Sequence, residues 1–402
     1  MKTKSSLSLI LAAATLPLSS AYGHTSGTTT WSGGTSSDWT DASNWSTATA
    51  PVTGGTNAIR INVLNDTNHP LEYTSAQGTT IYNPSDRALV IGSTSPSSVN
   101  GSMIITGGTF DSRGTGADLL GNVRAGTLTI AGGNYINTNG GSDEFFVVFN
   151  GTGTLNVNSG SFTTGILHYQ RINSGATGTV NLNGGVLTAS SILRSGTVSS
   201  TFNFNGGQFV ASDDVDFVST INLNVRDGGA KIDTNGNSVT VSGGLKNDGT
   251  GGLEKSGGGT LTLAGENTYI GNTTITAGTL TLADTSSMRF EIGDNEVNNS
   301  ILGSGTVNLD GMFEFDLTGA STNIGDFWNI VDLGNLSATF AGTFEVSSTQ
   351  GAFSGNAGVW SISENNVTYQ FSEATGVLTV IPEPTTALLG GLGLLALLRR
   401  RR

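Results

Sequence analysis

The stretch "TLTIAGGNY", residues 127–135, carries the pattern on which the fold depends. Its apolar residues alternate with polar ones, two glycines follow, and another apolar residue comes after them. An alternation with a period of two is typical of a β-strand that buries one face. Glycine readily adopts the positive φ angles that a sharp corner needs. The stretch therefore predicts a strand, a corner and the beginning of a second strand.

The same pattern recurs through the middle of the chain. Further copies are "MIITGGTF" at 103–110, "TLNVNSGSF" at 154–162, "TVNLNGGVL" at 179–187, "TFNFNGGQF" at 201–209 and "NLNVRDGGAKI" at 222–232. The second corner residues lie 25, 27, 25, 22 and 22 residues apart, at Gly108, Gly133, Gly160, Gly185, Gly207 and Gly229. A repeat of this length indicates a solenoid.

We predict a right-handed parallel β-helix, because a leucine-rich solenoid would need a Leu/Asn frame and a helical return that the repeat lacks. Coils of three short strands would stack about 4.8 Å apart. The alternation predicts two inward columns, which are Leu128, Leu155, Val180 and Phe202, and Ile130, Val157, Leu182 and Phe204. The outward side chains between them are expected to form a hydrogen-bonded surface ladder of Thr129, Asn156, Asn181 and Asn203.

Both flanks of the repeats are predicted to close the coil. Trp31, Trp39 and Trp45 lie close together before the repeats. An open β-helix end exposes strand edges, so the tryptophans are interpreted as a cap, with a sugar-binding aromatic platform as the alternative. At the other end, "VWSISENNVTYQFSEATGVLTV" at 359–380 predicts three antiparallel strands with turns near 364–366 and 373–376.

The N-terminus predicts export. Lys2 and Lys4 precede an apolar stretch at 7–18, and small residues come before a cut between Gly23 and His24. This arrangement is typical of a secretory signal peptide. The chain contains no cysteine, so no disulfide can hold the exported protein together.

The C-terminus combines three features in a fixed order. Pro382, Glu383 and Pro384 come first, an apolar run at 385–398 follows, and a basic cluster ends the chain at Arg399, Arg400, Arg401 and Arg402. As a helix, the run would reach roughly 21 Å, whereas the bilayer core is about 30 Å thick. An ordinary anchor is one interpretation, but prolines that break a helix just before the run favour a signal.

This tripartite end resembles the PEP-CTERM sorting signal of Gram-negative bacteria. The resemblance implies that an exosortase, a membrane transpeptidase-like enzyme, reads the motif and that the tail is an address. It further implies a protein anchored in the inner membrane before processing and found afterwards on the cell surface or in the extracellular matrix.

The segment at 251–284, "GGLEKSGGGTLTLAGENTYIGNTTITAGTLTLAD", closely resembles the autotransporter-associated β-strand repeat. The matching residues are Gly251 to Lys255, Gly259 to Leu263, Asn267 to Tyr269, Thr274, Ile275 and Ala277 to Leu280. This resemblance implies a β-helical stalk outside the cell and no catalytic residue. A complete autotransporter is not expected, because an apolar run and arginines stand where a membrane translocator would follow.

These observations predict an all-β chain between two targeting segments. The predicted segments are a signal peptide at 1–23, a Trp-containing segment that leads into and caps the helix at 24–100, the parallel β-helix at 101–285, a short antiparallel C-terminal region at 286–380, and the sorting signal with a hydrophobic transmembrane helix at 381–402.

The charge of the chain restricts its partners. The formal net charge is −13, and subtracting six basic residues at the two ends, Lys2, Lys4 and the four terminal arginines, gives −19. Such a surface repels nucleic acid, which is therefore not an expected partner. The expected partners are an exosortase-type enzyme and, before processing, the membrane, with an exopolysaccharide as an open alternative.

Histidine chemistry is not evident in the sequence. The histidines are His24, His69 and His168, and only the last lies within the repeats, beside Tyr169 and Arg171. Neither a Ser-His-Asp spacing nor an HExxH motif is visible. We predict no catalytic residue and no cofactor.

Two acidic groups are the remaining candidates. Asp213, Asp214 and Asp216 are interpreted as a solvated turn, with calcium binding as the alternative. A polysaccharide lyase or glycoside hydrolase would need paired carboxylates or a calcium cluster on one face of adjacent coils, and its nearest candidates are Asp111, Arg113 and Asp118. We therefore predict a non-catalytic, structural or adhesin-like protein without a metal site, and the β-helical lyase or hydrolase remains the alternative.

Overall fold

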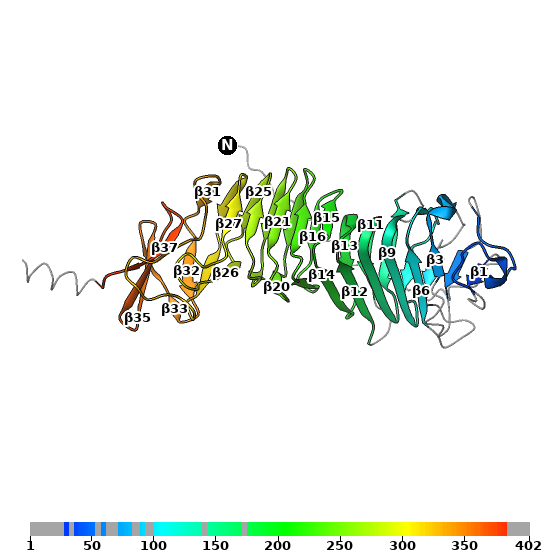
Figure 1. Ribbon diagram of the computed structural model, residues 1–402, viewed down its shortest axis with the longest axis horizontal. Helices are drawn as coiled ribbons and strands as arrows, with labels where there is room; N and C mark the ends of the chain where they lie inside the picture. Colours follow the sequence, from blue (N-terminus) through cyan, green and yellow to red (C-terminus); the bar gives the residue numbers. More distant parts are fainter. Residues whose placement is uncertain are drawn as a thin grey trace, which may run out of the picture.

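The chain folds into an elongated rod whose strands stack side by side along its long axis (Figure 1). The computed structural model describes residues 28–31, 36–52, 58–61, 71–82, 89–92, 100–138, 143–170 and 175–383. Within these ranges, helical structure is limited to two 3₁₀ turns, η1 (Ala42–Asn44) and η2 (Ser75–Gln77). The predicted signal peptide, the hydrophobic C-terminal helix and the residues Gly23, His24, Pro384 and Arg399 to Arg402 lie outside the described residues.

The coils of the rod build three parallel ladders, named A, B and C here. Ladder A contains β1 (Thr28–Trp31), β2 (Ala58–Ile61), β5 (Leu89–Ile91), β8 (Asp118–Leu120), β10 (Glu144–Val148) and the ends of β11 (Thr152–Tyr169) and β13 (Val186–Arg194). The same position in later coils is taken by β16 (Val215–Phe217), β19 (Ser238–Val241), β22 (Thr260–Leu263), β25 (Thr279–Leu282), β28 (Thr306–Leu309) and β31 (Ser337–Phe340).

Ladders B and C complete each coil. Ladder B contains β3 (Leu71–Tyr73), β6 (Gly101–Ile105), the first part of β9 (Ala125–Asn137) and of β11, β12 (Thr177–Leu182), β14 (Ser199–Phe204), β17 (Asn222–Val225) and β20 (Leu245–Asn247), and later coils supply β23 (Glu266–Asn267), β26 (Ser287–Glu291), β29 (Met312–Asp316) and β32 (Glu345–Ser348). Ladder C contains β4 (Thr79–Tyr82), β7 (Thr109–Ser112), the later part of β9, the middle of β11, the first part of β13, β15 (Gln208–Ala211), β18 (Ala230–Asp233), β21 (Leu253–Ser256), β24 (Thr273–Ile275) and β27 (Ile301–Gly303).

The predicted all-β parallel β-helix is confirmed, and three strands run through a corner without a break. β9 pairs with β6 along its first half and with β7 along its second half. β11 extends over 18 residues and takes part in all three ladders. Parallel pairing extends from β1 to β32, so it runs on both sides of the predicted repeat region.

Both predicted inward columns are confirmed. In the first column, Leu155 is in register with Leu128 and Val180, and Val180 is in register with Phe202. The second column follows the same pairings through Ile130, Val157, Leu182 and Phe204. All eight side chains are fully buried. Burial of one such side chain stabilises the fold by roughly 1.5–3 kcal/mol, so the stacked columns are the main source of stability.

The predicted surface ladder is also confirmed. The side-chain amide of Asn156 donates to Thr129 Oγ1 at 3.2 Å, and that of Asn181 donates to Asn156 Oδ1 at 2.8 Å. Asn203 donates to Asn181 Oδ1 at 2.7 Å, and Asn224 extends the row by donating to Asn203 Oδ1 at 2.8 Å. A side-chain amide both donates and accepts, so identical residues can bond in an unbroken row from coil to coil.

The corner glycines have two different roles, of which the sequence predicted one. Positive φ angles of 68°, 75° and 78° occur at Gly108, Gly160 and Gly229. At the other corners the absence of a side chain matters instead. A Cβ at Gly185 would lie 2.7 Å from Val157 Cγ1, and one at Gly207 would lie 2.7 Å from Leu182 Cδ1. These glycines allow the corner of one coil to contact the inward side chains of the preceding coil.

The predicted antiparallel strands form the C-terminal end of the rod (Figure 1). β35 (Val359–Glu364), β36 (Val367–Ser372) and β37 (Val377–Ile381) pair in antiparallel order and are joined at the predicted turns. β34 (Ser354–Asn356) pairs with β35, β30 (Phe327–Asn329) pairs with β37, and β33 (Gly351–Ala352) pairs with β32. The ring of Phe371 on β36 lies 5.8 Å from the rings of Phe313 and Phe315 on β29, so this sheet packs against the last aromatic layer of the core.

Candidate functional site

The three N-terminal tryptophans are buried, with 1%, 2% and 3% of Trp31, Trp39 and Trp45 exposed. The ring of Trp45 makes edge contacts with Trp31 and Trp39, at centroid distances of 5.0 and 4.9 Å. Trp45 Nε1 donates to the carbonyl of Trp39 at 2.8 Å. Rings packed in this way offer no face for stacking on a sugar, so the geometry favours the cap over the aromatic platform.

The candidate residues for polysaccharide cleavage do not form an accessible pair of carboxylates. Asp111 is 5% exposed and forms an ion pair with Arg113, with an Nη2–Oδ2 distance of 2.7 Å. Asp118 is fully buried. It accepts hydrogen bonds from the backbone N–H of Leu89 at 2.7 Å, from the Tyr135 hydroxyl and from the Asn137 amide.

The environment of Asp118 is that of a buried structural acid. Burial first, and then the charge of Asp118, raise the pKa of Tyr135 well above its ordinary value, so this tyrosine remains a hydrogen-bond donor. A glycosidase needs two carboxyl groups that flank a sugar bond. Asp118 is buried in the interior of the rod, so its carboxylate cannot contact a polysaccharide.

The second acidic group forms bonds within the rod. Asp214 Oδ1 accepts from the backbone N–H of Ser238 at 2.7 Å, and Asp216 Oδ1 accepts from Ser242 Oγ at 2.8 Å, each partner lying one coil further along the chain. Asp213 Oδ1 accepts from the backbone N–H of Asp214 at 2.8 Å. In the part of the chain that the structure describes, no group of three or more histidine and acidic side chains is arranged to hold a metal ion.

The structure brings together one constellation that the sequence did not reveal. His168 on β11 contacts Glu144 on β10 through Nδ1, at 2.5 Å from Oε1, and Ser195 after β13 through Nε2, at 2.8 Å from Oγ. The neighbour Tyr169 points inward and is fully buried, whereas His69 and Arg171 lie outside the described residues. The sequence separations of 24 and 27 residues each correspond to one coil. The repeat period was therefore the only sequence signal for this group.

An open groove of about 1010 Å³ follows the later coils, from β18 towards the loop after β29. Among the described residues, its charged lining consists of Asp227, Glu254, Glu291, Asp316 and one base, Lys231. None of the described residues that line the groove is aromatic. It therefore lacks the stacking surface typical of sugar recognition, and its acidic lining repels anionic polymers.

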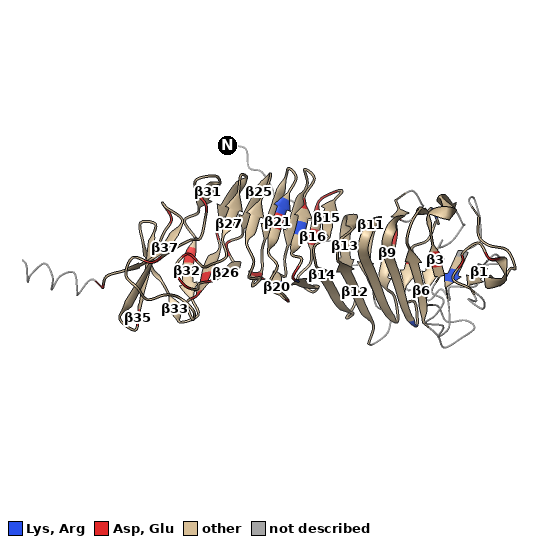
Figure 2. Ribbon diagram, in the orientation of Figure 1, with Lys and Arg blue, Asp and Glu red and all other residues tan. Residues whose placement is uncertain are grey.

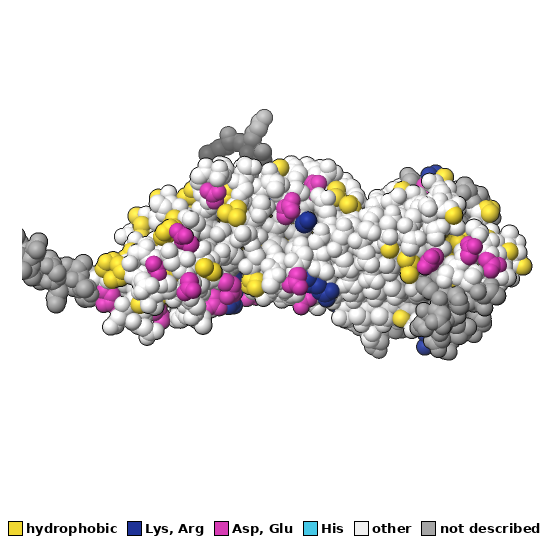
Figure 3. All heavy atoms as spheres, in the orientation of Figure 1, with side chains coloured by type: hydrophobic (Ala, Val, Ile, Leu, Met, Phe, Trp, Pro, Cys, Tyr) yellow, Lys and Arg dark blue, Asp and Glu magenta, His cyan; other side chains and the backbone are white. Residues whose placement is uncertain are grey.

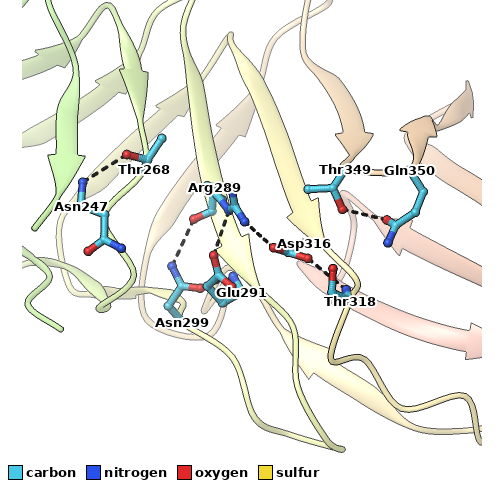
Figure 4. Close-up of polar contacts among 9 residues, drawn as sticks. All are labelled: Asn247, Thr268, Arg289, Glu291, Asn299, Asp316, Thr318, Thr349 and Gln350. Carbon is cyan, nitrogen blue, oxygen red and sulfur yellow. Dashed lines mark hydrogen bonds and ion pairs between the residues drawn. The ribbon is translucent and has the colours of Figure 1, made fainter. Parts of the chain in front are cut away.

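Ion pairs hold one wall of this groove (Figure 4). Arg289 on β26 contacts Glu291 on its own strand, at an Nε–Oε1 distance of 2.8 Å, and Asp316 on β29. Hydrogen bonds from Thr318 first, together with the charge of Arg289, lower the pKa of Asp316. Asn299 holds the same strand from the other side, by accepting from the Glu291 N–H at 2.8 Å. The arrangement fixes the wall and leaves no free base or nucleophile among these five residues.

Two residues of the predicted sorting motif, Pro382 and Glu383, lie within the described residues, directly after the last strand. β37 ends at Ile381, Pro382 is exposed and Glu383 follows it as the last described residue. Within the described ranges, no helix has the length and apolar character required to cross a membrane.

Two segments of the chain match known families. Residues 253–282 match the passenger-associated-transport-repeat, and residues 380–402 match the PEP-CTERM protein-sorting motif. Both predicted resemblances are thereby confirmed. No curated protein matched the chain, and no solved structure did. The two matches indicate an exported β-helix protein of the Gram-negative cell surface.

Proposed function

We propose that this protein is a structural rod of the cell surface or extracellular matrix. The observation that carries the proposal is the parallel pairing that recurs from β1 to β32, with buried tryptophans at one end and an antiparallel sheet at the other. A rod closed at both ends does not offer strand edges for uncontrolled association. The families that match the chain are a sorting signal and a passenger repeat, and neither is catalytic.

The proposed partner during export is an exosortase-type enzyme, since the sorting motif implies such processing. Pro382, Glu383 and Pro384 would be presented outside the inner membrane, while the cluster at 399–402 holds the end of the tail in the cytoplasm. Moving one arginine to the bilayer centre costs about 2.5–3.5 kcal/mol on insertion scales. The four arginines would therefore stop transfer, and the short apolar run would keep the motif near the membrane.

The proposed partner after export is a polysaccharide of the matrix. The described lining of the groove offers such a polymer hydrogen-bonding groups but no stacking surface, and its acidic residues favour a neutral polymer over an acidic one. Cleavage of glycosidic bonds is not proposed, because Asp118 is buried and Asp111 is paired with Arg113.

The proposal is tested with two versions of the full chain expressed in a Gram-negative host that has an exosortase. We expect the intact chain to reach the cell surface and a chain that ends at Ile381 to be exported without being retained there. Intact-mass analysis of the surface material should show a product that lacks Arg402.

A variant with all four terminal arginines changed to serine is the matched control, and it should be exported but processed differently. A mature wild-type product that still carries Arg402 would show a plain anchor and would overturn the sorting step. If the chain ending at Ile381 is retained at the surface as well as the intact chain, the tail has no role in localisation.

A further inference from the structure

The side chains of Glu144, His168 and Ser195 lie in one line across three successive coils, on the outer face of ladder A. Phe146 of β10 is in register with His168 of β11, and His168 is in register with Leu193 of β13. Glu144 lies two residues before Phe146 and Ser195 two residues after Leu193, so acid and hydroxyl approach the imidazole from opposite sides. The register of the β-helix fixes this order.

The hydrogen-bonding capacity of the three groups sets the direction of both bonds. An ionised carboxylate can only accept, so Nδ1 of a neutral imidazole carries the proton and donates to Glu144. Nε2 is then the acceptor, and the hydroxyl of Ser195 donates to it at 2.8 Å. A hydroxyl that donates to an imidazole oriented by an acid has the arrangement of an activated serine nucleophile.

The surroundings hold the imidazole in place. Its ring stacks on Phe146, at a centroid distance of 4.7 Å and an interplanar angle of 27°. The histidine side chain is 10% exposed and that of Glu144 is 24% exposed, so water reaches the pair only in part. Phe146 also belongs to a small apolar cluster on this outer face with Val90, Leu119, Ala117 and Phe149. The imidazole therefore lies at the border of a buried apolar cluster.

The turn that carries the hydroxyl is also held. Arg194 reaches over it and donates from Nη2 to the carbonyl of Val198 at 2.7 Å. Gly196 directly follows the serine and has a φ of 69°. In the described part of the chain, its backbone N–H makes no hydrogen bond. The N–H of the residue after a nucleophilic serine is a common donor to the oxyanion that forms during acyl transfer.

We propose that Ser195, His168 and Glu144 form a hydrolytic triad that cleaves carboxylic esters. Ser195 Oγ attacks the ester carbonyl carbon while its proton passes to His168 Nε2. The C–O bond to the alcohol breaks, and the proton on Nε2 goes to the departing alkoxide. Water then attacks the acyl-serine, loses a proton to Nε2 and releases the carboxylic acid, and Ser195 regains its proton. Glu144 stabilises the imidazolium in both steps and acts as a positioning residue.

The preferred substrate is an ester with a short apolar acyl group carried on a larger molecule. Leu193, which is 39% exposed, lies in register with His168 and offers apolar surface for such a group. The triad lies on the outer face of a ladder, and Ser195 is half-exposed beside the exposed Gly196 and Thr197, so the alcohol portion of the ester extends towards solvent. This activity is independent of the sorting step and of the groove.

The experiment uses the mature full-length protein, a fluorophosphonate probe and p-nitrophenyl acetate and butyrate. We expect the probe to label Ser195 once per chain, as located by peptide mass mapping. Ser195→Ala and His168→Gln should each lower kcat/KM by about 100-fold or more, which is the usual contribution of a nucleophile–base pair. Glu144→Gln should lower kcat while KM stays within about twofold, since it positions the base and does not bind the ester.

Ser190→Ala is the matched control, because Ser190 lies on β13, the strand that leads to Ser195, and its Oγ donates to the carbonyl of Gly165 at 2.8 Å. Its hydrolysis and labelling should equal those of the wild type. Circular dichroism melting establishes that each variant is folded. Labelling that is absent, spread over several serines or unchanged in His168→Gln would overturn the proposal. Ester turnover that survives in folded Ser195→Ala would overturn it as well.

Discussion

The early and late coils of the rod share one interior but differ in how they treat their surface. From β9 to β17 the outer face of ladder B carries uncharged amides that bond from coil to coil. From β17 to β29 the neighbouring coils are linked by ion pairs, which join Arg226 to Asp248, Lys246 to Glu266 and Arg289 to Asp316. Figures 2 and 3 show the same change, since charged side chains gather over the later coils and are sparse over β9 to β13. The fold thus constrains the inside of a coil and leaves the outside open to variation.

One interior position also distinguishes the late coils. Lys255 of β21 occupies an inward column between Ile232 and Ile275 and is fully buried. Its ammonium donates to the carbonyls of Ser256, Gly257 and Ala277, at 2.9, 2.8 and 3.0 Å. Burial lowers the pKa of this lysine. A late coil therefore uses a cation at a place where early coils use only apolar or neutral side chains.

The largest effect is expected from Val180→Asp, which places a charge in an early inward column. The variant loses roughly 1.5–3 kcal/mol of burial and encloses an unpaired carboxylate, which costs several kcal/mol more. Because each coil contacts only its neighbours, β11 to β14 should lose protection in hydrogen–deuterium exchange while β22 to β28 keep it. Leu261→Asp should reverse this pattern.

The control for this comparison is Thr179→Asp, at the half-exposed position next to Val180. It should change the free energy of unfolding by less than about 1 kcal/mol. If hydrogen exchange instead rises equally in both halves of the rod after Val180→Asp, that result contradicts a solenoid in which each coil is stabilised only by its neighbours.

A smaller effect is expected from Lys255→Met, which removes the interior cation of the late coils. Three carbonyl groups lose their donor, and we expect a loss of about 1–3 kcal/mol in chemical denaturation. The pKa of Lys255 is lower in the folded than in the unfolded chain, so the unfolded chain binds more protons between the two values. The difference in stability between wild type and variant should therefore grow as the pH rises towards 10.5, the ordinary lysine value.

Lys231→Met is the matched control, since Lys231 lies half-exposed on β18 in the same ladder. It should leave the free energy of unfolding within about 0.5 kcal/mol of the wild type. A Lys255→Met variant as stable as the wild type at every pH would mean that the three carbonyls find other donors.

The smallest effects should separate the two kinds of surface. Asn181→Ala breaks two bonds of the amide row and should cost about 1–2 kcal/mol, with little dependence on salt. Arg289→Gln breaks partly exposed ion pairs and should cost about 0.2–1 kcal/mol, and this loss should shrink at about 1 M salt, where the screening length is near 3 Å. Denaturation curves at low and high salt measure both. Equal salt dependence in the two variants would contradict the distinction between an uncharged early surface and an ion-paired late surface.

The inward columns and the amide row could be predicted because both depend on a period of two and a repeat of nearly constant length. Lys255 was not predicted as an interior residue, because a charged residue in an alternating strand pattern is normally assigned to the solvent-facing side. The reason for glycine at Gly185 and Gly207 could not be predicted either, because it depends on how closely one coil approaches the next.

The Glu144, His168 and Ser195 constellation could not be predicted for a further reason. Its separations of 24 and 27 residues differ, since the loops at the corners differ in length. The period alone indicates which coils are neighbours but not which residues meet. The sorting motif, by contrast, is read as a linear segment and needs no register.

The amide row has a consequence for how such a rod can change its length. Asn156, Asn181, Asn203 and Asn224 present the same donor and acceptor to the coil before and the coil after, so the row itself imposes no order on these coils. Insertion or loss of one coil would move the two caps apart or together by about 4.8 Å and leave the hydrogen bonds of the row chemically the same. On this face of the rod, the distance between the two caps is therefore open to gradual evolutionary adjustment through the number of coils, without a new kind of surface contact.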